Sequence, residues 1–370
     1  MKKPLLIVAV VGTLLVTGCF DEDKKPEPKP IRLELKQLME LPGVAHSGPL
    51  GLTLSDDGTL ISTGLGDVIT KRNKSGTIYT AAPQSSNLVE RSIDSGAGED
   101  YYGFSSAVYS KKLNSLFVCS VPLLSFGAIA PTVVEFKLDS GTGHYVWTSV
   151  MNFNGAQPSQ LCKGMAIQNN NLLVVNMVAI NDSYPVLYRV DLRNPLPATM
   201  PVSILYRDLG YTASEMLAES VVDIAPEMEE YSEAKNPGDF HVYLLDRSRR
   251  SIDEVIFRNA SGSISVTEAN FDIKIIRDPL SFINIDYRKF ILSGGAHSHS
   301  PTALYEIYYP DGFHPIYSFL ALAPSQISSF AYGQSRSGSG NSLYAALTSA
   351  DEKGKFHVAE YSYNGQSYRD

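Results

Sequence analysis

The sequence predicts an all-β protein folded as a six-bladed β-propeller, and three observations support this. Short β-branched and aromatic segments bounded by turn residues recur along the chain, which is the pattern of strands. These segments group into units of four, and the unit repeats six times. The last unit stops before its fourth strand, while an extra strand pattern precedes the first unit. Radial repetition of four-stranded sheets is typical of a β-propeller.

The second strand of each unit gives the clearest repeat. Its apolar part begins at Leu60, Leu116, Leu172, His241, Phe290 and Leu343. The intervals between these positions are 56, 56, 69, 49 and 53 residues. We assign the excess of the longest interval to an acidic loop at 226–238. The alternative is a seven-bladed ring, which requires extra strands inside that interval.

The other strands follow from their distance to the second strand and from their alternation of apolar and polar residues. Inner strands are expected at 50–54, 105–109, 164–168, 221–225, 282–286 and 327–331. Third strands that run into turns, as hairpin strands do, are expected in the segments 133–141, 186–194, 252–262, 303–312 and 357–365. A more polar fourth strand follows in most units, for example at 145–150 and 202–207.

The two ends of the chain fit a closed ring. The sixth unit ends at 366–370, where its fourth strand is due, and the segment 32–41 reads as an additional strand. We therefore expect the N-terminal strand to complete the last blade, because closure removes exposed sheet edges. Residues 31–370 then form a single propeller domain.

The first unit carries a family resemblance. The segment Gly48–Gly64, followed by Val68–Gly76, resembles the NHL repeat and the propellers related to senescence-marker protein and gluconolactonase. The other units match these families in pattern more than in residues. The resemblance implies a propeller with its site at the central channel.

Composition excludes several classes of protein. The 370 residues are 44% hydrophobic and only 19% charged, with a formal net charge of −8. A disordered chain is richer in charge, and a polytopic membrane protein has several long apolar runs, of which this chain has one. A nucleic-acid-binding protein needs clustered Lys and Arg, so the acidic balance argues against that partner.

The single apolar run belongs to a predicted signal peptide. Lys2 and Lys3 precede a short apolar stretch that ends in Val16-Thr-Gly-Cys19. These four residues resemble the lipobox of bacterial lipoproteins. The resemblance implies removal of residues 1–18, a diacylglyceryl group on the Cys19 thiol and an acyl chain such as palmitate on its amine, which would anchor the chain in a membrane. An ordinary signal with an incidental cysteine is the alternative.

The segment 19–30 is acidic and proline-rich, and we expect it to be an extended tether. Because Phe20 is not the aspartate that retains such proteins at an inner membrane, we expect anchoring in the cell outer membrane, with the periplasmic or surface face open. Removal of the signal takes away two lysines, which leaves 29 basic and 39 acidic residues and a charge of −10.

The gluconolactonase resemblance implies a divalent ion, usually calcium, held by oxygen ligands at the channel. The oxygen donors on or near the inner strands are Asn176, Asp223, Asn284 and Asp286. The chain enters its first inner strand at 45–49 without the glutamate of the lactonases, and strand alternation turns some of these donors away from the channel. We therefore assign no cofactor and keep calcium as an open alternative.

His297 and His299 are a second set of candidate ligands. A spacing of two in an extended segment points both imidazoles to one side, as a metal pair requires. A solvated loop is the competing interpretation. The sequence contains no Gly-X-Ser-X-Gly elbow, phosphate-binding loop or His-Glu-X-X-His helix, so no catalytic residue is assigned.

Two further features concern cysteines and partners. Cys119 and Cys162 lie in adjacent units and are expected either to form a disulfide or to remain buried thiols. The apolar loop 121–131 contains Leu123, Leu124, Phe126 and Ile129, and it forms either a partner surface or a plug in the channel.

These features predict a non-catalytic, lipid-anchored binding or scaffolding module for another envelope protein or an extracellular ligand. The alternative is a metal-dependent hydrolase of the lactonase or esterase type with its site at the channel. Enzymatic activity is left undecided, with the missing catalytic motifs favouring a binding protein.

Overall fold

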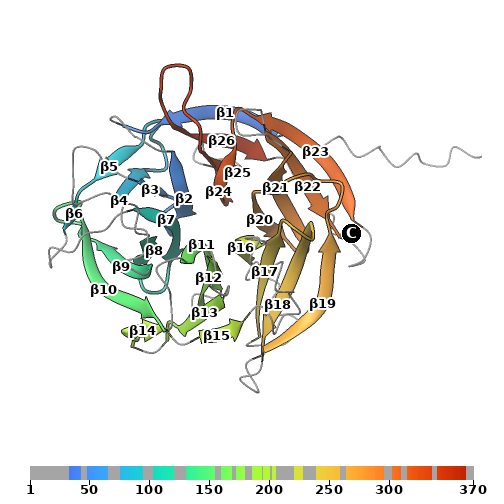
Figure 1. The fold of residues 1–370 in the computed structure, drawn as a ribbon. Coiled ribbons are helices and arrows are strands. Elements are labelled where there is room, and N and C mark those ends of the chain that lie inside the picture. The colour runs from blue at the N-terminus through green and yellow to red at the C-terminus, as the bar shows by residue number, and fades with distance from the viewer. Residues whose placement is uncertain are drawn as a thin grey trace, which may run out of the picture.

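Six sheets, antiparallel apart from two short pairings in blade 2, surround a common axis in the computed structural model, so the chain is an all-β, six-bladed propeller (Figure 1). The structure describes residues 33–42, 48–65, 76–94, 103–120, 131–154, 160–168, 172–179, 186–193, 195–200, 202–205, 221–227, 239–258, 264–295, 302–309, 315–335 and 340–363. Within these ranges, no helix is long and apolar enough to cross a membrane.

The first three blades follow the expected order of strands from the axis outward. Blade 1 contains β2 (Pro49–Leu54), β3 (Leu60–Leu65), β4 (Gly76–Ala81) and β5 (Val89–Arg91). Blade 2 contains β7 (Phe104–Ser110), β8 (Ser115–Ser120), β9 (Thr132–Leu138) and β10 (Tyr145–Phe153). Blade 3 contains β11 (Gln160–Gln168), β12 (Leu172–Ala179), β13 (Val186–Asp191) and β15 (Val202–Leu205).

The other three blades repeat this arrangement. Blade 4 contains β16 (Val221–Pro226), β17 (Phe240–Asp246), β18 (Ser251–Phe257) and β19 (Ile264–Asp272). Blade 5 contains β20 (Ser281–Asp286), β21 (Lys289–Gly294), β22 (Thr302–Tyr308) and β23 (Ile316–Ala323). Blade 6 contains β24 (Ile327–Gln334), β25 (Asn341–Leu347), β26 (His357–Tyr363) and the N-terminal strand β1 (Leu33–Glu40).

The N-terminal strand closes the ring as predicted. β1 pairs antiparallel with β26 from Leu33 opposite Tyr363 to Glu40 opposite His357. The Gln37 side chain adds a hydrogen bond of 2.7 Å from Nε2 to the buried carboxylate of Glu360. Each inner strand falls where the sequence placed it, so the six-bladed prediction is confirmed and the seven-bladed alternative is wrong.

Blade 2 departs from the expected four strands. Two short strands, β6 (Ile93–Asp94) and β14 (Thr199–Met200), pair in parallel with opposite ends of β10. Because β14 lies in the chain between strands of blade 3, it ties the outer edge of blade 2 to blade 3. These two-residue pairings carry no sequence pattern of their own, which is why the sequence did not predict them.

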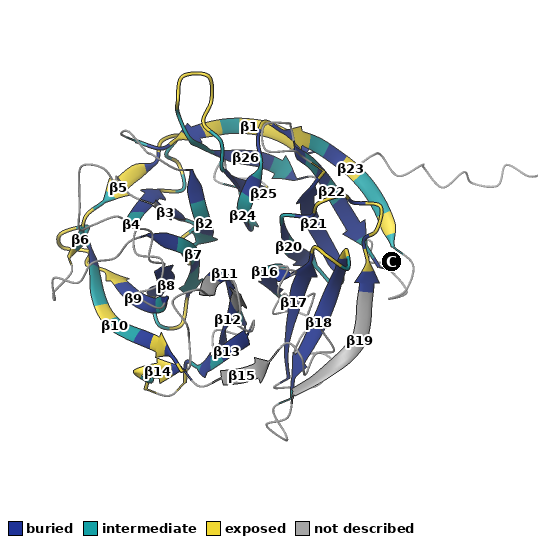
Figure 2. Ribbon diagram, viewed as in Figure 1, coloured by how far each residue is buried: buried dark blue, intermediate teal, exposed yellow. Residues whose placement is uncertain are grey.

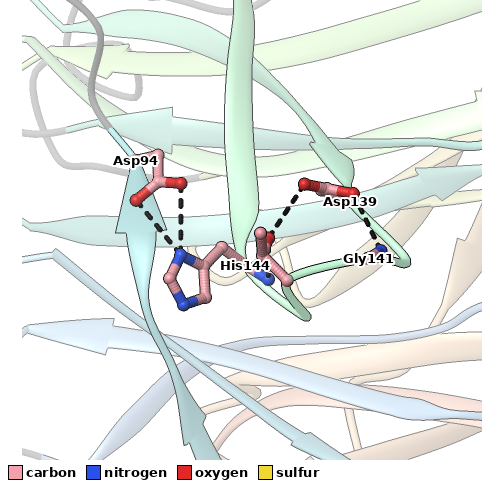
Figure 3. Close-up of polar contacts among 5 residues, drawn as sticks. Asp94, Asp139, Gly141 and His144 are labelled. Atoms are coloured by element: carbon pink, nitrogen blue, oxygen red, sulfur yellow. Dashed lines mark hydrogen bonds and ion pairs between the residues drawn. The ribbon is translucent and has the colours of Figure 1, made fainter.

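The turn between β9 and β10 shows the chemistry behind a predicted hairpin. The Asp139 carboxylate accepts hydrogen bonds from the Gly141 amide at 2.9 Å and from the Thr142 hydroxyl at 2.9 Å (Figure 3). These hydrogen bonds, the Gly141 amide first, lower the pKa of Asp139. At the end of the same turn, Nδ1 of His144 lies 3.1 Å from a carboxylate oxygen of Asp94 on β6.

The core lies between neighbouring blades. Second and third strands are buried along most of their length, while exposed residues collect on the outer strands and turns (Figure 2). Inner strands approach so closely that a Cβ on Gly51 would lie 2.7 Å from the backbone nitrogen of Ala107 in blade 2. Both faces of each blade are therefore covered by the next blade, which explains the small share of charged residues in the composition.

Candidate functional site

Asp223 is the candidate ligand that lies at the centre of the ring. Its Oδ2 accepts hydrogen bonds from the Ser281 hydroxyl at 2.7 Å and from the Phe282 amide at 3.1 Å, both in blade 5. Its Oδ1 accepts the amide of Ile224 at 2.9 Å. The residue as a whole is half-buried, but its carboxylate is enclosed between two inner strands. Burial raises the pKa of Asp223 to about 7, although the hydrogen bonds act in the opposite direction.

Asn284 and Asp286 hold a turn at the other end of the blade 5 inner strand. The Asn284 side-chain amide donates to the carbonyls of Asp286 at 2.8 Å and Lys289 at 3.2 Å. The Asp286 carboxylate accepts the amide of Tyr287 at 2.8 Å. Ser281, the partner of Asp223, and Asp286 lie at opposite ends of β20. The structure therefore does not bring Asn284 and Asp286 together with Asp223.

Asn176 is fully buried on β12, the second strand of blade 3. His297, His299 and the loop residues Leu123, Leu124, Phe126 and Ile129 lie outside the described residues, as does Cys19. The structure therefore tests neither the histidine pair nor the apolar loop nor the lipid anchor.

Cys119 and Cys162 meet at the seam of blades 2 and 3. Both are buried in one hydrophobic cluster, and both are free thiols. Burial, reinforced by an interaction with Cys162, raises the pKa of the Cys119 thiol well above its ordinary range. Whether the two cysteines oxidise to a disulfide or remain thiols stays a prediction.

A cluster that the sequence analysis missed lies in blade 4. It consists of Glu227, directly after β16, His241 on β17 and Glu254 on β18, all buried. Nδ1 of His241 lies 2.7 Å from Oε1 of Glu254 and 3.6 Å from Oε2 of Glu227. Tyr243 donates a hydrogen bond of 3.4 Å to the other oxygen of Glu227. Imidazole and carboxylate groups are the ligands that transition metals use in proteins.

A sequence signal for part of this cluster existed. Glu254 stands in the middle of an apolar third strand, and glutamates recur at the same place in the third strands of blades 2, 5 and 6, as Glu135, Glu306 and Glu360. Their repetition marks a buried carboxylate in these blades. Glu227 lies close to His241 and Glu254 because three strands pack side by side. The spacing of residues along the sequence does not reveal this.

Five exposed apolar residues lie on the outer strands of blades 5 and 6. We call this set the rim patch, and it comprises Leu35 and Leu38 on β1 and Ile316, Phe319 and Leu322 on β23. Each of these residues is 44–61% exposed. β1 and β23 contact each other, and Leu33 and Leu320 on the same two strands share a buried cluster (Figure 1). Clustered exposed apolar residues mark interaction surfaces more often than scattered ones do.

Comparisons with known proteins agree on the fold. No family model and no curated protein matches the chain. Among solved structures, the PQQ-bound aldose sugar dehydrogenase of Streptomyces coelicolor matches with a TM-score of 0.55 at 9% identity, covering 91% of this chain and 99% of that one.

Two further solved structures match to a similar degree. The Hadza microbial sialidase Hz136 has a TM-score of 0.56 at 10% identity, covering 87% of this chain and 66% of its own. A protein of unknown function from Dyadobacter fermentans has a TM-score of 0.55 at 10% identity, covering 90% of this chain and 99% of its own. At these identities the likeness establishes the propeller fold and leaves function to the residues.

Proposed function

We propose that this chain is a lipoprotein of the cell outer membrane whose propeller is a non-catalytic binding or scaffolding module for another envelope protein. The observation that carries this proposal is the rim patch, because five exposed apolar residues lie on two outer strands that contact each other. A partner protein that covers this surface would remove apolar area from water.

The place of the rim patch in the chain supports the same proposal. β1, which supplies Leu35 and Leu38, begins only 14 residues after Cys19, the predicted point of lipid attachment (33 minus 19). At roughly 3 Å per residue, a proline-rich tether of this length keeps the rim patch within a few tens of ångströms of the bilayer. A partner held in the same membrane is therefore within reach of the rim patch.

The alternative, a metal-dependent lactonase or esterase at the channel, finds less support in the described residues. Asp223 accepts a hydrogen bond from the backbone of blade 5, and Asn284 donates to the backbone of a turn. The two side chains therefore do not point to one shared ion. Hydrolysis of lactones by the purified protein, abolished by a chelator, would favour this alternative.

Site-specific crosslinking in the intact envelope tests the binding proposal. A photo-crosslinkable residue placed at Phe319 or Leu322 should form a discrete adduct with one envelope protein. Leu138, 50% exposed at the end of β9 in blade 2, is the matched control and should form none. Equal adducts at Leu138 and Leu322, or no adduct at either rim position, would count against the proposal.

The anchor is tested separately. Cys19→Ser should release the protein from the outer-membrane fraction, because the thiol is the predicted site of lipid attachment. A variant that stays in the membrane fraction and still carries acyl chains would show that lipidation at Cys19 is wrong.

A further inference from the structure

Four blades contain equivalent sets of three residues, which we call rows. Each row consists of one residue at the end of the inner strand, the residue paired with it near the start of the second strand, and a glutamate in the third strand. The rows are Ser110–Ser115–Glu135 in blade 2, Glu227–His241–Glu254 in blade 4, Asp286–Lys289–Glu306 in blade 5 and Gly333–Ser342–Glu360 in blade 6.

In blades 2 and 6 neutral donors satisfy the buried glutamate. Glu135 accepts hydrogen bonds of 2.7 Å from the hydroxyls of Ser115 and Ser149. Glu360 accepts one of 2.9 Å from Ser342 in addition to the bond from Gln37. A buried carboxylate in such a row therefore belongs to the architecture of the blade and by itself indicates no ligand.

In blade 5 a lysine takes the place of the neutral donor. The Lys289 ammonium lies 3.3 Å from Glu306, and both side chains are almost fully buried. Two carboxylates of that row, those of Asp286 and Glu306, thus share the blade with one ammonium group. A buried charge is tolerated when such a counter-charge accompanies it.

Blade 4 differs from the other three rows in two respects. Its second-strand residue is His241, and an imidazole ring has a nitrogen that can bind a metal ion. The serines and the lysine of the other rows offer no such ligand. Its inner-strand residue is a second glutamate, Glu227. One ligand atom from each of Glu227, His241 and Glu254 lies within 4.8 Å of the others, and this is the only such trio of His, Cys, Asp or Glu among the described residues.

We propose that Glu227, His241 and Glu254 bind a divalent transition-metal ion, with Zn²⁺ as the best fit. Two carboxylates and a neutral imidazole carry a charge of −2, which one divalent ion balances. An imidazole ligand favours zinc over calcium or magnesium, which prefer oxygen ligands alone.

The distances leave room for such an ion after a small adjustment. Ligand atoms about 2.1 Å from a tetrahedral zinc ion lie about 3.4 Å apart. The separation of 3.6 Å between His241 and Glu227 already fits this value. The 2.7 Å contact between Nδ1 of His241 and Oε1 of Glu254 is a hydrogen bond. When the ion binds Nδ1, the ring proton must sit on Nε2, so that the imidazole stays neutral, and the Glu254 carboxylate must withdraw by roughly 0.7 Å.

The three side chains are buried, and we therefore assign the ion a structural role. The side chains of His241 and Glu254 are each 4% exposed and that of Glu227 is not exposed at all. Tyr243, which holds the other oxygen of Glu227, packs its ring against Phe290 of blade 5 with centroids 4.9 Å apart. Zinc therefore links the first three strands of blade 4 and stabilises the folded protein, as ligands of the native state do.

Metal binding to the full-length, detergent-solubilised protein tests this proposal. After removal of metal with a chelator, titration with ZnCl₂ alone should show one ion bound per chain and a rise in the thermal unfolding midpoint. Glu227→Gln and His241→Gln should weaken zinc binding by at least about 10- to 100-fold, the loss seen even for outer-shell partners. Glu360→Gln, the matched change in blade 6, should leave zinc affinity unchanged.

A spectroscopic measurement on the unmodified protein covers the case in which a variant does not fold. Co²⁺ bound to these three residues should give a visible d–d spectrum that zinc abolishes. The proposal is overturned if the folded, unmodified protein binds neither ion in a one-to-one ratio. Equal zinc affinity in folded Glu227→Gln and Glu360→Gln would overturn it too, as would loss of zinc binding only on substitution of His297 and His299.

Discussion

The carboxylate of Asp223 on the inner strand of blade 4 accepts a hydrogen bond of 2.7 Å from the hydroxyl of Ser281 on the inner strand of blade 5. The adjacent Phe282 amide donates to the same oxygen. This polar contact joins the inner strands of blades 4 and 5. Farther out, the hydroxyls of Tyr309 and Tyr317 in blade 5 join the same two blades by donating to the Asp272 carbonyl of blade 4. The strength of the contact between Asp223 and Ser281 depends on the protonation of one buried carboxyl group.

Asp223 should make stability depend on pH. Burial raises its pKa from the ordinary 3.8 to about 7 in the folded protein. Between these values the folded state retains a proton that the unfolded state has released, so the free energy of unfolding falls as pH rises. The slope is at most about 1.4 kcal/mol per pH unit.

Asp223→Asn should remove this contribution. We expect urea unfolding of the variant to depend less on pH than that of the parent protein between about pH 4 and pH 7. Asp56→Asn, at a carboxylate 70% exposed, serves as the control and should keep the parent slope. Identical slopes for all three proteins would contradict the assignment.

The buried pair of Lys289 and Glu306 yields a second prediction. The two side chains are 4% and 2% exposed, and Tyr363 donates a hydrogen bond to the same glutamate. Lys289→Met leaves the carboxylate buried without its cation and should lower the free energy of unfolding by about 3–5 kcal/mol.

The surface pair of Lys36 and Glu34 is the control for that prediction. Its atoms are 2.8 Å apart, but the side chains are 44% and 70% exposed. Lys36→Met should therefore cost less than about 1 kcal/mol in the same denaturant experiment. Similar losses for Lys289→Met and Lys36→Met would show that the buried pair contributes no more to the free energy of unfolding than the surface pair.

Gly51 should resist substitution because of the close approach of two inner strands. A Cβ at this position would lie 2.5 Å from Oγ1 of Thr63 and 2.7 Å from the nitrogen of Ala107. Gly51→Ala must displace backbone, and we expect a loss of at least about 1–3 kcal/mol, as in other overpacked cores. At Gly141 the nearest atom, a carboxylate oxygen, lies 3.3 Å away, so Gly141→Ala should unfold close to the parent in a thermal scan.

Ring closure by β1 predicts opposite outcomes for two neighbouring residues. Met39 is fully buried against blades 1 and 6, whereas Leu38 is 44% exposed. Met39→Ala should lower the free energy of unfolding by about 2–5 kcal/mol. Leu38→Ala should change it by about 0.5 kcal/mol or less, since it removes no core contact. Equal effects in chemical denaturation would mean that β1 does not seal the last blade.

The buried thiols should be inert in the folded protein. The raised pKa of Cys119 leaves little thiolate, which is the reactive form. We expect Cys119 and Cys162 to resist alkylation under native conditions and to react after denaturation without reductant. Failure to react after denaturation, with restoration by a reductant, would reveal the alternative disulfide.

Local patterns were sufficient to predict the strands because alternation and turn residues are local properties. The six inner strands, the second strands and the closure by β1 all agree with the structure. The small strands β6 and β14 were not predicted, since a pairing of two residues depends on which segments happen to run beside β10.

The candidate metal ligands could not be predicted in the same way, because a site depends on which side chains come together in space. Asp223, Asn284 and Asp286 share inner strands, yet Asp223 binds the next blade while the other two hold a turn at the far end of β20. Strand alternation predicts which face of a sheet a side chain lies on. It predicts neither the position of that side chain along the propeller axis nor the hydrogen-bond donors beside it.

The amino-acid sequence alone determined the number of blades and the strand that closes the ring, since repeat length and alternation are written along the chain. It also carried the motif that predicts lipid attachment at Cys19. Only the tertiary structure brought Glu227, His241 and Glu254 to one point. Glu227 follows β16, while His241 and Glu254 lie on β17 and β18, so the register of three neighbouring strands sets their distances. All three residues are buried.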